Sequence, residues 1–277
     1  FSAWAELDVN VRETEALLTG FSYSGDSISR YANIFHNQDP QKHDVEKVLP
    51  SNTSAFFCLN LENHKQYFEE YSDYLKQQGH NLQAMAAIDE INDNLSLSIV
   101  DLMASFAENE ICLAFTDIFT TDIYSNGFVV LGTKGKRLAS EKMNALLQKH
   151  AGKNERLIST YKESYQIDED TEFSIFQMPY EDVFRHLYGS VFSLVKTRYF
   201  AFVDNYIVFA ENKNALKQFI KQNVLQNTLR TDIDYTKFTE YLSKKVNLYF
   251  YADIPEAFDL LISGFETEIR NNLREHT

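Results

Sequence analysis

Among the side chains that could bind a metal ion, the densest group lies in one polar segment near the N-terminus. His36, Asp39, His43 and Asp44 crowd this segment, and imidazole and carboxylate groups can both ligate zinc. Their spacing follows no fixed metal-binding pattern, and the surrounding amides and Pro40 are typical of a surface connection. We therefore expect solvated side chains here, with a metal site as the alternative.

Two further runs contain residue types that bind calcium or phosphate ions, but their spacing does not match that of known calcium or phosphate loops. The acidic cluster Asp168–Glu172 contains no turn glycine, which a calcium loop requires, so we expect a solvated entry into a strand or, otherwise, an adventitious cation. The run Gly132–Lys136 resembles part of a phosphate loop without its spacing, and we expect a solvated turn from a strand into a helix. The remaining histidines are scattered along the chain: His64, His80, His150, His186 and His276.

Sequence signatures of catalytic sites are missing. The chain has no glycine-rich nucleotide-binding motif, no serine nucleophile elbow, no His-Glu-x-x-His helix and no Cys-x-x-Cys pair. Paired carboxylates for glycoside cleavage cannot be recognised from sequence. The 16 tyrosines and 22 phenylalanines could stack on sugars, but most of them fall on apolar faces and are expected in the core. We therefore assign no catalytic residue, no cofactor and no metal ligand.

The composition fits a folded, acidic protein with one large or two medium domains. Of its 277 residues, 44% are hydrophobic and 14% aromatic, which is enough for a sizeable core. The formal net charge of −14 makes nucleic acid phosphates and anionic lipid headgroups poor partners unless a basic patch is concentrated somewhere. No apolar run reaches the roughly 18 residues that a membrane helix needs. We expect no nucleic acid partner, and membrane contact only through a segment outside this chain.

A short apolar strand, a polar capping residue and an amphipathic helix recur in four variants. In the first, a strand over Ala55–Leu61 and then Asn63 precede a helix with apolar residues at i, i+3, i+4, i+7 and i+8. The Asn, Thr or Asp after each strand can accept hydrogen bonds from the first free N–H groups of the helix. The other strands and capping residues are Phe128–Leu131 with Thr133, Tyr206–Ala210 with Asn212, and Val246–Tyr251 with Asp253.

The strands arrive mostly as hairpins with helices appended. Glu110–Phe115 is expected to pair with Phe128–Leu131, and 198–203 with 206–210 across the turn Asp204-Asn205. The pattern predicts an α+β fold with mostly antiparallel sheets and repeated strand–helix units packed on one face. The other expected elements are helices over 82–107 and 180–192 and a strand over Thr171–Gln177.

The two cysteines, Cys58 and Cys112, each lie in an apolar strand-like run. Free cysteine often behaves as a small buried hydrophobe, and we expect this of both residues. A disulfide between neighbouring strands is the alternative. So low a use of cysteine does not fix the redox compartment.

The chain is expected to divide into two parts. We interpret 1–47 as a strand-rich segment, the end of a preceding repeat or a sheet edge, and 48–277 as the main α+β domain. An internal duplication would make 48–150 and 151–277 related halves. Because the chain opens in a strand pattern and closes in a helical one, we expect a piece of a longer protein, with a native chain with frayed ends as the alternative.

The run Val48–Leu61 resembles the opening of a bacterial domain-of-unknown-function family. Its Leu49–Thr53 matches the pattern Leu-Pro-x-Asp/Asn-Thr and leads into a strand that ends near Asn60, and the resemblance spans most of 48–262. Asn52 stands where acidic residues are common. The resemblance implies an exported protein that is anchored near its N-terminus, with the globular part outside the inner membrane. No catalytic or binding residues are established for the family.

Two functions are therefore compared. The first is a non-enzymatic extracytoplasmic scaffold or interaction module of a larger anchored bacterial protein, with an unknown protein or a cell-envelope component as its partner. The second is a glycan- or peptide-binding protein or a hydrolase with an unrecognised site, which a deep pocket with converging polar groups would support. A carrier of hydrophobic ligands would need a continuous apolar cavity.

Overall fold

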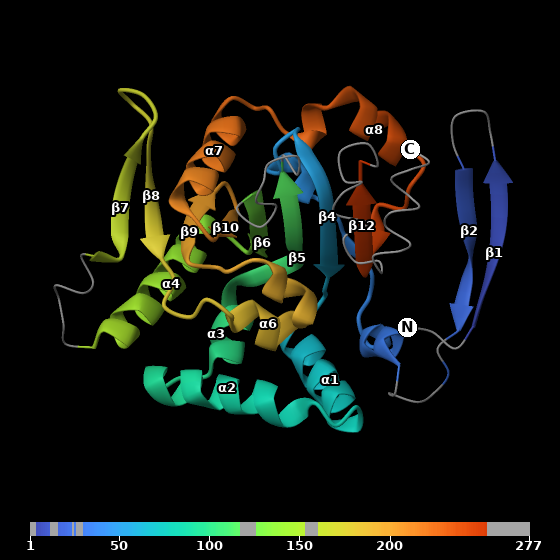
Figure 1. Ribbon diagram of the computed structural model, residues 1–277, viewed down its shortest axis with the longest axis horizontal. Helices are drawn as coiled ribbons and strands as arrows, with labels where there is room; N and C mark the ends of the chain where they lie inside the picture. The colour runs from blue at the N-terminus through green and yellow to red at the C-terminus, as the bar shows by residue number, and fades with distance from the viewer. Residues whose placement is uncertain are drawn as a thin grey trace, which may run out of the picture.

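The computed structural model describes residues 4–11, 16–23, 25, 30–116, 126–152 and 160–253. One large sheet forms its centre. The strands of this sheet are β4 (Thr53–Asn60), β5 (Ala107–Thr116), β6 (Gly127–Thr133), β7 (Lys162–Gln166), β8 (Glu172–Gln177), β9 (Tyr199–Val203), β10 (Tyr206–Ala210) and β12 (Leu248–Ala252). Their order is β12-β4-β5-β6-β10-β9-β8-β7, and every neighbouring pair is antiparallel (Figure 1).

Two smaller sheets accompany the large one. The hairpin of β1 (Trp4–Val11) and β2 (Ala16–Tyr23) lies to one side of the main sheet, beyond β12 (Figure 1). The short strands β3 (Gln41–Lys42) and β11 (Lys245–Val246) pair with each other. This second pair fixes the polar segment around His43 to the chain just before β12.

The α-helices are α1 (His64–Gln77), α2 (Asn81–Leu95), α3 (Ile99–Phe106), α4 (Lys136–Ala151), α6 (Val183–Tyr188), α7 (Lys213–Val224) and α8 (Ile233–Thr239), and the 3-10 helices are η1 (Tyr31–Phe35), η2 (Val45–Lys47), η4 (Ser190–Leu194) and η5 (Leu229–Thr231). Helices α1, α4 and α7 each follow a strand of the large sheet, and the others follow a helix or a loop. In the described part of the chain, no helix combines the length and the apolarity that crossing a bilayer requires. The expected α+β class with antiparallel strands is confirmed.

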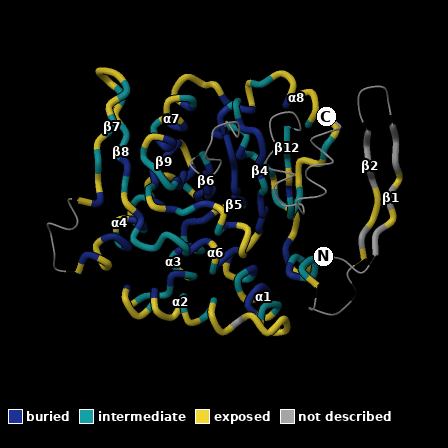
Figure 2. Tube along the Cα trace, viewed as in Figure 1, coloured by how far each residue is buried: buried dark blue, intermediate teal, exposed yellow. Residues whose placement is uncertain are grey.

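Both faces of the large sheet are buried because its central strands carry apolar side chains on both sides (Figure 2). In β4, Ala55 and Leu59 belong to one half of the core, and Phe56 and Cys58 belong to the other. Helices α1 to α4 and α6 cover the first face, whereas α7, α8, η2 and η5 cover the second. The expected packing of the helices on a single face therefore needs correction: near-continuous apolar strands require cover on both sides.

Most of the expected element boundaries are observed. The side chain of Asn63 accepts hydrogen bonds from the N–H groups of the first turn of α1, and Asn212 does the same for α7. Asp204 has a φ of 48° in the turn between β9 and β10, as a primed hairpin turn requires. The prediction that Thr133 caps the next helix is wrong: Thr133 is the last residue of β6, and Gly135 is the residue that precedes α4.

The helix expected over 82–107 is two helices. Ser96, with a φ of 51°, ends α2 in the left-handed region, and the side chain of Ser98 caps α3. The apolar spacing continues across this break because both helices pack on the same face of the sheet. The helix expected after Asp253 lies outside the described residues.

Phe209→Ala is expected to lower the free energy of unfolding by about 3–5 kcal/mol. Phe209 is fully buried, with its ring centroid 4.6 Å from that of Phe184 and 5.5 Å from that of Phe200, so truncation leaves a cavity. The matched control is Phe250→Ala on the edge strand β12, where the side chain is 63% exposed, and its cost should stay below about 1 kcal/mol. Chemical denaturation measures both, and equal losses would contradict this placement of the core.

Candidate functional site

A buried carboxylate, that of Glu110, links three parts of the chain. Between Ala107 and Ile111 the register of β5 against β6 shifts, and such a bulge re-aims the side chains beside it. The Glu110 side chain is 4% exposed. Its Oε1 accepts a hydrogen bond from the Tyr206 hydroxyl at 2.7 Å, and its Oε2 accepts one from the backbone N–H of Asp44 at 3.2 Å.

A glycine makes room for this carboxylate. A Cβ atom at Gly132 on β6 would lie 3.3 Å from the backbone oxygen of Glu110 and 3.4 Å from its Cγ. Gly132 is also the β6 residue that pairs with Tyr206 of β10. The missing side chain therefore lets the Glu110 carboxylate and the Tyr206 hydroxyl meet across the strand that separates them.

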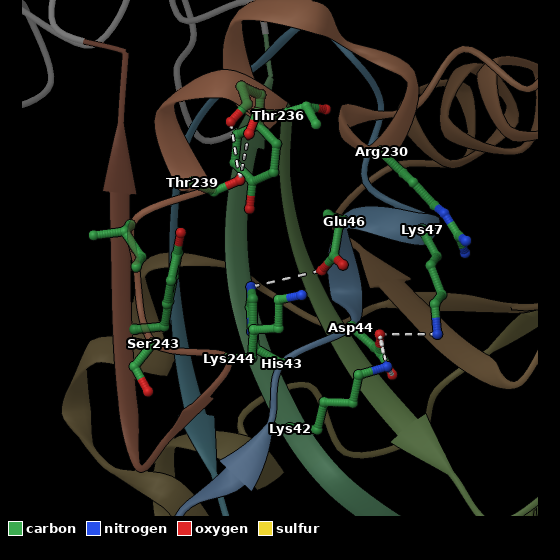
Figure 3. Close-up of a pocket in the computed structure, with 13 residues that line it drawn as sticks. Lys42, His43, Asp44, Glu46, Lys47, Arg230, Thr236, Thr239, Ser243 and Lys244 are labelled. Atoms are coloured by element: carbon green, nitrogen blue, oxygen red, sulfur yellow. Dashed lines mark hydrogen bonds and ion pairs between the residues drawn. The ribbon is translucent and has the colours of Figure 1, made fainter.

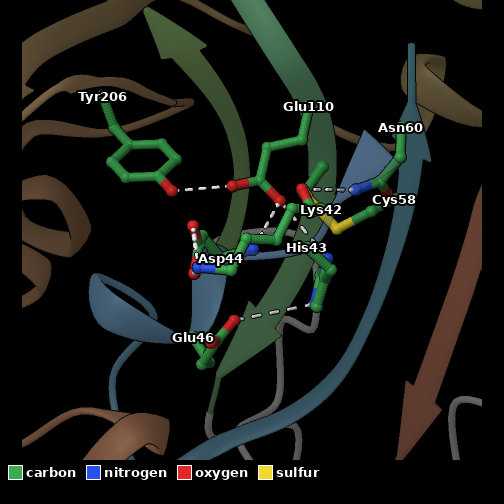
Figure 4. Close-up of a disulfide and its surroundings, with 9 residues drawn as sticks. Lys42, His43, Asp44, Glu46, Cys58, Asn60, Glu110 and Tyr206 are labelled. Atoms are coloured by element: carbon green, nitrogen blue, oxygen red, sulfur yellow. Dashed lines mark hydrogen bonds and ion pairs between the residues drawn. A yellow bond between two sulfur atoms is a disulfide. The ribbon is translucent and has the colours of Figure 1, made fainter. Parts of the chain in front are cut away.

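His43 lies beside Glu110, between two carboxylates (Figure 4). Its Nδ1 is 3.3 Å from Glu110 Oε2, and its Nε2 is 3.9 Å from Glu46 Oε2. The imidazole stacks on the Tyr249 ring with centroids 4.3 Å apart, and its side chain is only 7% exposed. Among the described residues, neither ring nitrogen of His43 has a hydrogen-bond partner. The expectation that this histidine is a solvated surface side chain is therefore wrong, because β3 and the sheet enclose it.

Asp44 and two lysines form the outer layer of the site. Asp44 accepts hydrogen bonds from Lys42 at 2.8 and 2.9 Å, and Lys47 Nζ lies 2.9 Å from the same carboxylate. Burial acts to raise the pKa of Asp44, but the bonds from Lys42 and Lys47 outweigh it and hold the pKa below its usual value. Asp44 is therefore ionised at neutral pH and neutralises part of the lysine charge.

Burial changes the acidity of two other groups in the site. It raises the pKa of the Glu46 carboxyl. It also raises the pKa of the Tyr206 hydroxyl, and the neighbouring charge of Glu110 adds to this effect. Tyr206 is therefore a permanent hydrogen-bond donor, whereas Glu46 takes up a proton more readily than an exposed glutamate.

Two pockets open on this network. The first has a volume of about 360 Å³, and Figure 3 shows His43 and Glu46 facing each other within it, with Arg230 and Lys47 on one side. The residues that bear on its chemistry are Lys42, His43, Asp44, Glu46, Lys47, Arg230, Lys244 and Tyr249. The second, of about 370 Å³, is lined by Glu110, Tyr206 and Gly132 and shares Lys42, Asp44 and Lys47 with the first. Chemically, the arrangement offers hydrogen-bonding and cationic groups to a small polar ligand.

The structure separates the residues that were considered as an alternative metal site. His36 and Asp39 are exposed, whereas His43 is enclosed. Within the described ranges, no group of three His, Cys, Asp or Glu side chains is arranged to hold a metal ion. Glu110 and Tyr206 were missed by sequence analysis, because a glutamate at a strand entrance and a tyrosine in an apolar strand carry no distinguishing signal.

Of the other sequence candidates, only the beginning of the run Gly132–Lys136 belongs to this site, where Gly132 and Thr133 line the second pocket. Asp168 accepts hydrogen bonds from the N–H groups of Asp170 and Thr171 in the turn between β7 and β8. The run Gly132–Lys136 forms the end of β6 and the start of α4. Of the remaining histidines, His80 and His150 are exposed and His186 is partly buried, while His276 lies outside the described residues.

His64 is a core histidine at the start of α1. Its Nε2 is 2.6 Å from the carbonyl oxygen of Glu108, which can only accept, so Nε2 carries the proton. Its Nδ1, at 2.9 Å, then accepts the hydrogen bond of the Tyr188 hydroxyl. Burial lowers the pKa of His64 to about 4, which keeps the imidazole neutral at physiological pH.

Cys58 and Cys112 form a disulfide within the sheet (Figure 4). The antiparallel register of β4 and β5 places the two residues directly opposite each other, with their Cα atoms 4.1 Å apart. The expectation of two free buried thiols is thus wrong, and the alternative of a disulfide between neighbouring strands is confirmed. The sequence does not reveal the register in which β4 and β5 pair, and the disulfide depends on this register.

A family model described as "Protein of unknown function (DUF3352)" matches residues 28–266. The chain belongs to the DUF3352 family. The match includes all residues of the two pockets and both cysteines. No curated protein and no solved structure matches the chain significantly. The expected membership in a family of unknown function is confirmed.

In this DUF3352 domain, Tyr206→Phe is expected to lower the free energy of unfolding by about 1–3 kcal/mol, because a buried carboxylate oxygen loses its donor. Tyr241→Phe removes the same hydroxyl from a tyrosine that is 72% exposed, and should change the stability by less than about 0.5 kcal/mol. Urea denaturation of the two variants compares these values. A Tyr206→Phe variant as stable as the control would show that the bond to Glu110 contributes nothing.

The stability of the domain should fall as the pH drops from about 6.5 towards 4, in part because of His64. The unfolded imidazole takes up a proton near pH 6.5, whereas the folded one resists until about 4. The contribution is therefore complete above pH 6.5 and declines by roughly 3 kcal/mol across this window.

His64→Gln should flatten this part of the pH profile, and His80→Gln, at an exposed position, should leave it as in the wild type. Denaturation at a series of pH values measures the three slopes. If the stability of the His64→Gln variant fell with pH as steeply as that of the wild type, His64 would not be the source of this pH dependence.

Proposed function

We propose that this DUF3352 domain is a non-enzymatic extracytoplasmic scaffold or interaction module of a larger, membrane-anchored bacterial protein. The Cys58–Cys112 disulfide carries the proposal. Disulfides form and persist in oxidising compartments, such as the bacterial periplasm and the cell surface, and are rare where thiols are kept reduced. The resemblance of Val48–Leu61 to exported, anchored proteins supports the same location.

The position of the disulfide strengthens this argument. Both cysteines are fully buried, in the half of the core that contains Phe56, Ala114 and Val208. A bond at this depth is built into the fold, and cross-links of this kind typically contribute about 2–4 kcal/mol. It is therefore a structural cross-link that suits a domain outside the cytoplasm.

The surface of α8 supports an interaction role. Ile233, Phe238 and Tyr241, on α8 and just after it, are all exposed. Exposed apolar groups mark a binding surface where they form one contiguous patch, and we propose that these residues contribute to such a patch. The partner that we propose is a protein or another component of the cell envelope.

A second candidate function is a glycan- or peptide-binding protein or a hydrolase. One observation favours it: the imidazole of His43, which lies between the carboxylates of Glu110 and Glu46, lines a pocket together with Glu46 and Tyr249. Turnover of a substrate from a broad hydrolase panel, abolished by His43→Asn in a variant that still folds, would decide for an enzyme against the interaction module.

The redox state of the two cysteines in the natural cell tests the proposal. After acid quenching, denaturation and alkylation of free thiols, Cys58 and Cys112 should remain unlabelled until a reductant is added. The natural full-length protein should also fractionate with membranes and be open to an external protease once the outer barrier is permeable.

Two results would contradict this proposal. The first is a pair of cysteines that react before reduction, which would place the domain in a reducing compartment. The second is a full-length protein that is protected from protease until the inner membrane is broken. A Cys58→Ala, Cys112→Ala double variant, in which neither residue can react, controls for labelling of other sites.

A further inference from the structure

His43 lies between two carboxylates that it can face together only in its protonated form. Its Nδ1 is 3.3 Å from Glu110 Oε2 and its Nε2 is 3.9 Å from Glu46 Oε2, and both are ion-pair distances. A neutral imidazole has one N–H group and one lone pair, whereas the imidazolium ion has two N–H groups and a positive charge. In the neutral form, one ring nitrogen would therefore present its lone pair to a carboxylate oxygen.

The burial of this cluster makes its charge balance important. The side chains of His43 and Glu110 are almost fully enclosed, so water and salt screen their attraction less than they would at the surface. A buried carboxylate that loses an oppositely charged neighbour is destabilised. Loss of the imidazolium proton would leave the Glu110 carboxylate to the Tyr206 hydroxyl and the Asp44 N–H alone.

The tyrosines around this ring and the neighbouring Asp44 do not change their charge between pH 6 and 8.5. Burial raises the pKa of the hydroxyl groups of Tyr206, Tyr235 and Tyr249, so these side chains stay neutral. Burial also acts to raise the pKa of Asp44, but its two lysine partners hold that pKa below the usual value. Asp44 therefore stays ionised.

Glu46 and four cations complete the charged surroundings of His43. Burial raises the pKa of Glu46, so proton uptake there belongs to the acid end of this range, where it leaves the pair of His43 and Glu110 intact. Lysine and arginine ordinarily stay charged throughout the range, whereas histidine ordinarily changes its charge within it. The cationic side chains that line the first pocket are Lys42, Lys47, Arg230 and Lys244.

The segment that carries His43 separates the two pockets and has few bonds to the rest of the sheet. Lys42, Asp44 and Lys47 line both pockets. The strand β3 has only two residues, and the N–H of His43 donates to a backbone carbonyl just before β11 at 3.2 Å. Asn60 Nδ2 donates to the carbonyl of Lys42 at 3.4 Å, while its buried Oδ1 has no hydrogen-bond partner among the described residues. Segments with so few bonds open locally before the whole fold does.

We propose that residues 41–47 form a proton-controlled latch between the two pockets, closed while the His43 imidazolium lies between Glu110 and Glu46 and loosened when the ring loses its proton. An open latch joins pockets of about 360 and 370 Å³ into one cleft. The fully buried side chain of Val45 favours reclosure. This inference goes beyond both candidate functions and depends on neither.

Amide hydrogen exchange of the whole domain at pH 6 and pH 8.5 tests the latch. Protection is expressed relative to the unstructured-peptide rate at each pH, and β6 serves as the internal reference. Because the protonated ring stabilises the closed form, its contribution is lost as the pH rises, which is opposite in sign to the effect of His64. Protection over 41–47, relative to β6, should be at least about fivefold lower at pH 8.5. Equal relative protection at the two pH values would overturn the proposal.

Two substitutions identify the responsible ring. In His43→Gln, protection over 41–47 should be as low at pH 6 as that of the wild type at pH 8.5, so the difference between the two pH values disappears. The control His36→Gln changes an exposed histidine of the same polar segment and should retain the wild-type difference. Circular dichroism confirms folding of each variant. A folded His43→Gln variant that keeps the wild-type difference, or a His36→Gln variant that loses it, would refute the latch.

The charge of the ring can also be followed in the wild-type domain, without any substitution. Nitrogen NMR of the histidine rings should show both nitrogens of His43 protonated at pH 6, and the ring is recognised by its contact with Tyr249, whose centroid lies 4.3 Å away. The midpoint of its proton loss should coincide with the midpoint at which protection over 41–47 falls. A His43 ring that is already neutral at pH 6, or two midpoints that differ, would exclude control by this proton.

Discussion

The need to satisfy one buried charge, that of Glu110, organises the polar side of this domain. A carboxylate taken out of water is tolerated only where donors surround it, and here the donors come from distant parts of the sequence: the Tyr206 hydroxyl on β10 and the backbone N–H of Asp44 after β3. The bulge in β5 and the absence of a side chain at Gly132 allow these groups to converge. The polar segment near the N-terminus thereby becomes a wall of the pocket instead of a surface loop.

The two faces of the sheet differ in the side chains that they bury. The face covered by α1 to α4 and α6 is a large apolar core, in which His64 is kept neutral by its burial. The other face holds the disulfide, the stacked rings of His43 and Tyr249, and the carboxylates that they border. The cross-link between β4 and β5 lies beneath this polar site (Figure 4). Strands of the large sheet therefore support these polar groups, while α8 presents the apolar side chains of Ile233 and Phe238 to solvent.

Much of the fold could be predicted from local patterns, but little of the site could. Capping at Asn63 and Asn212 and the hairpin turn at Asp204 depend on a few neighbouring residues, and these predictions are confirmed. The disulfide, the environment of His43 and the role of Glu110 depend on strand register and on pairing between β3 and β11, which join residues far apart in the chain. A period-2 pattern does not reveal which strands are neighbours. The division at 47 and the relation of 48–150 to 151–277 stay predictions.

The central claim is that the Glu110 carboxylate holds residues 41–47 against the sheet, and amide hydrogen exchange of a Glu110→Gln variant tests it directly. Glutamine carries no charge, so the charge-assisted bonds that Glu110 accepts from the Tyr206 hydroxyl and the Asp44 N–H are lost. The account predicts exchange at least about tenfold faster over 41–47, with β6 unchanged and no effect of the control Glu108→Gln at an exposed position. Unchanged exchange over 41–47, or an equal acceleration throughout the domain, would contradict it.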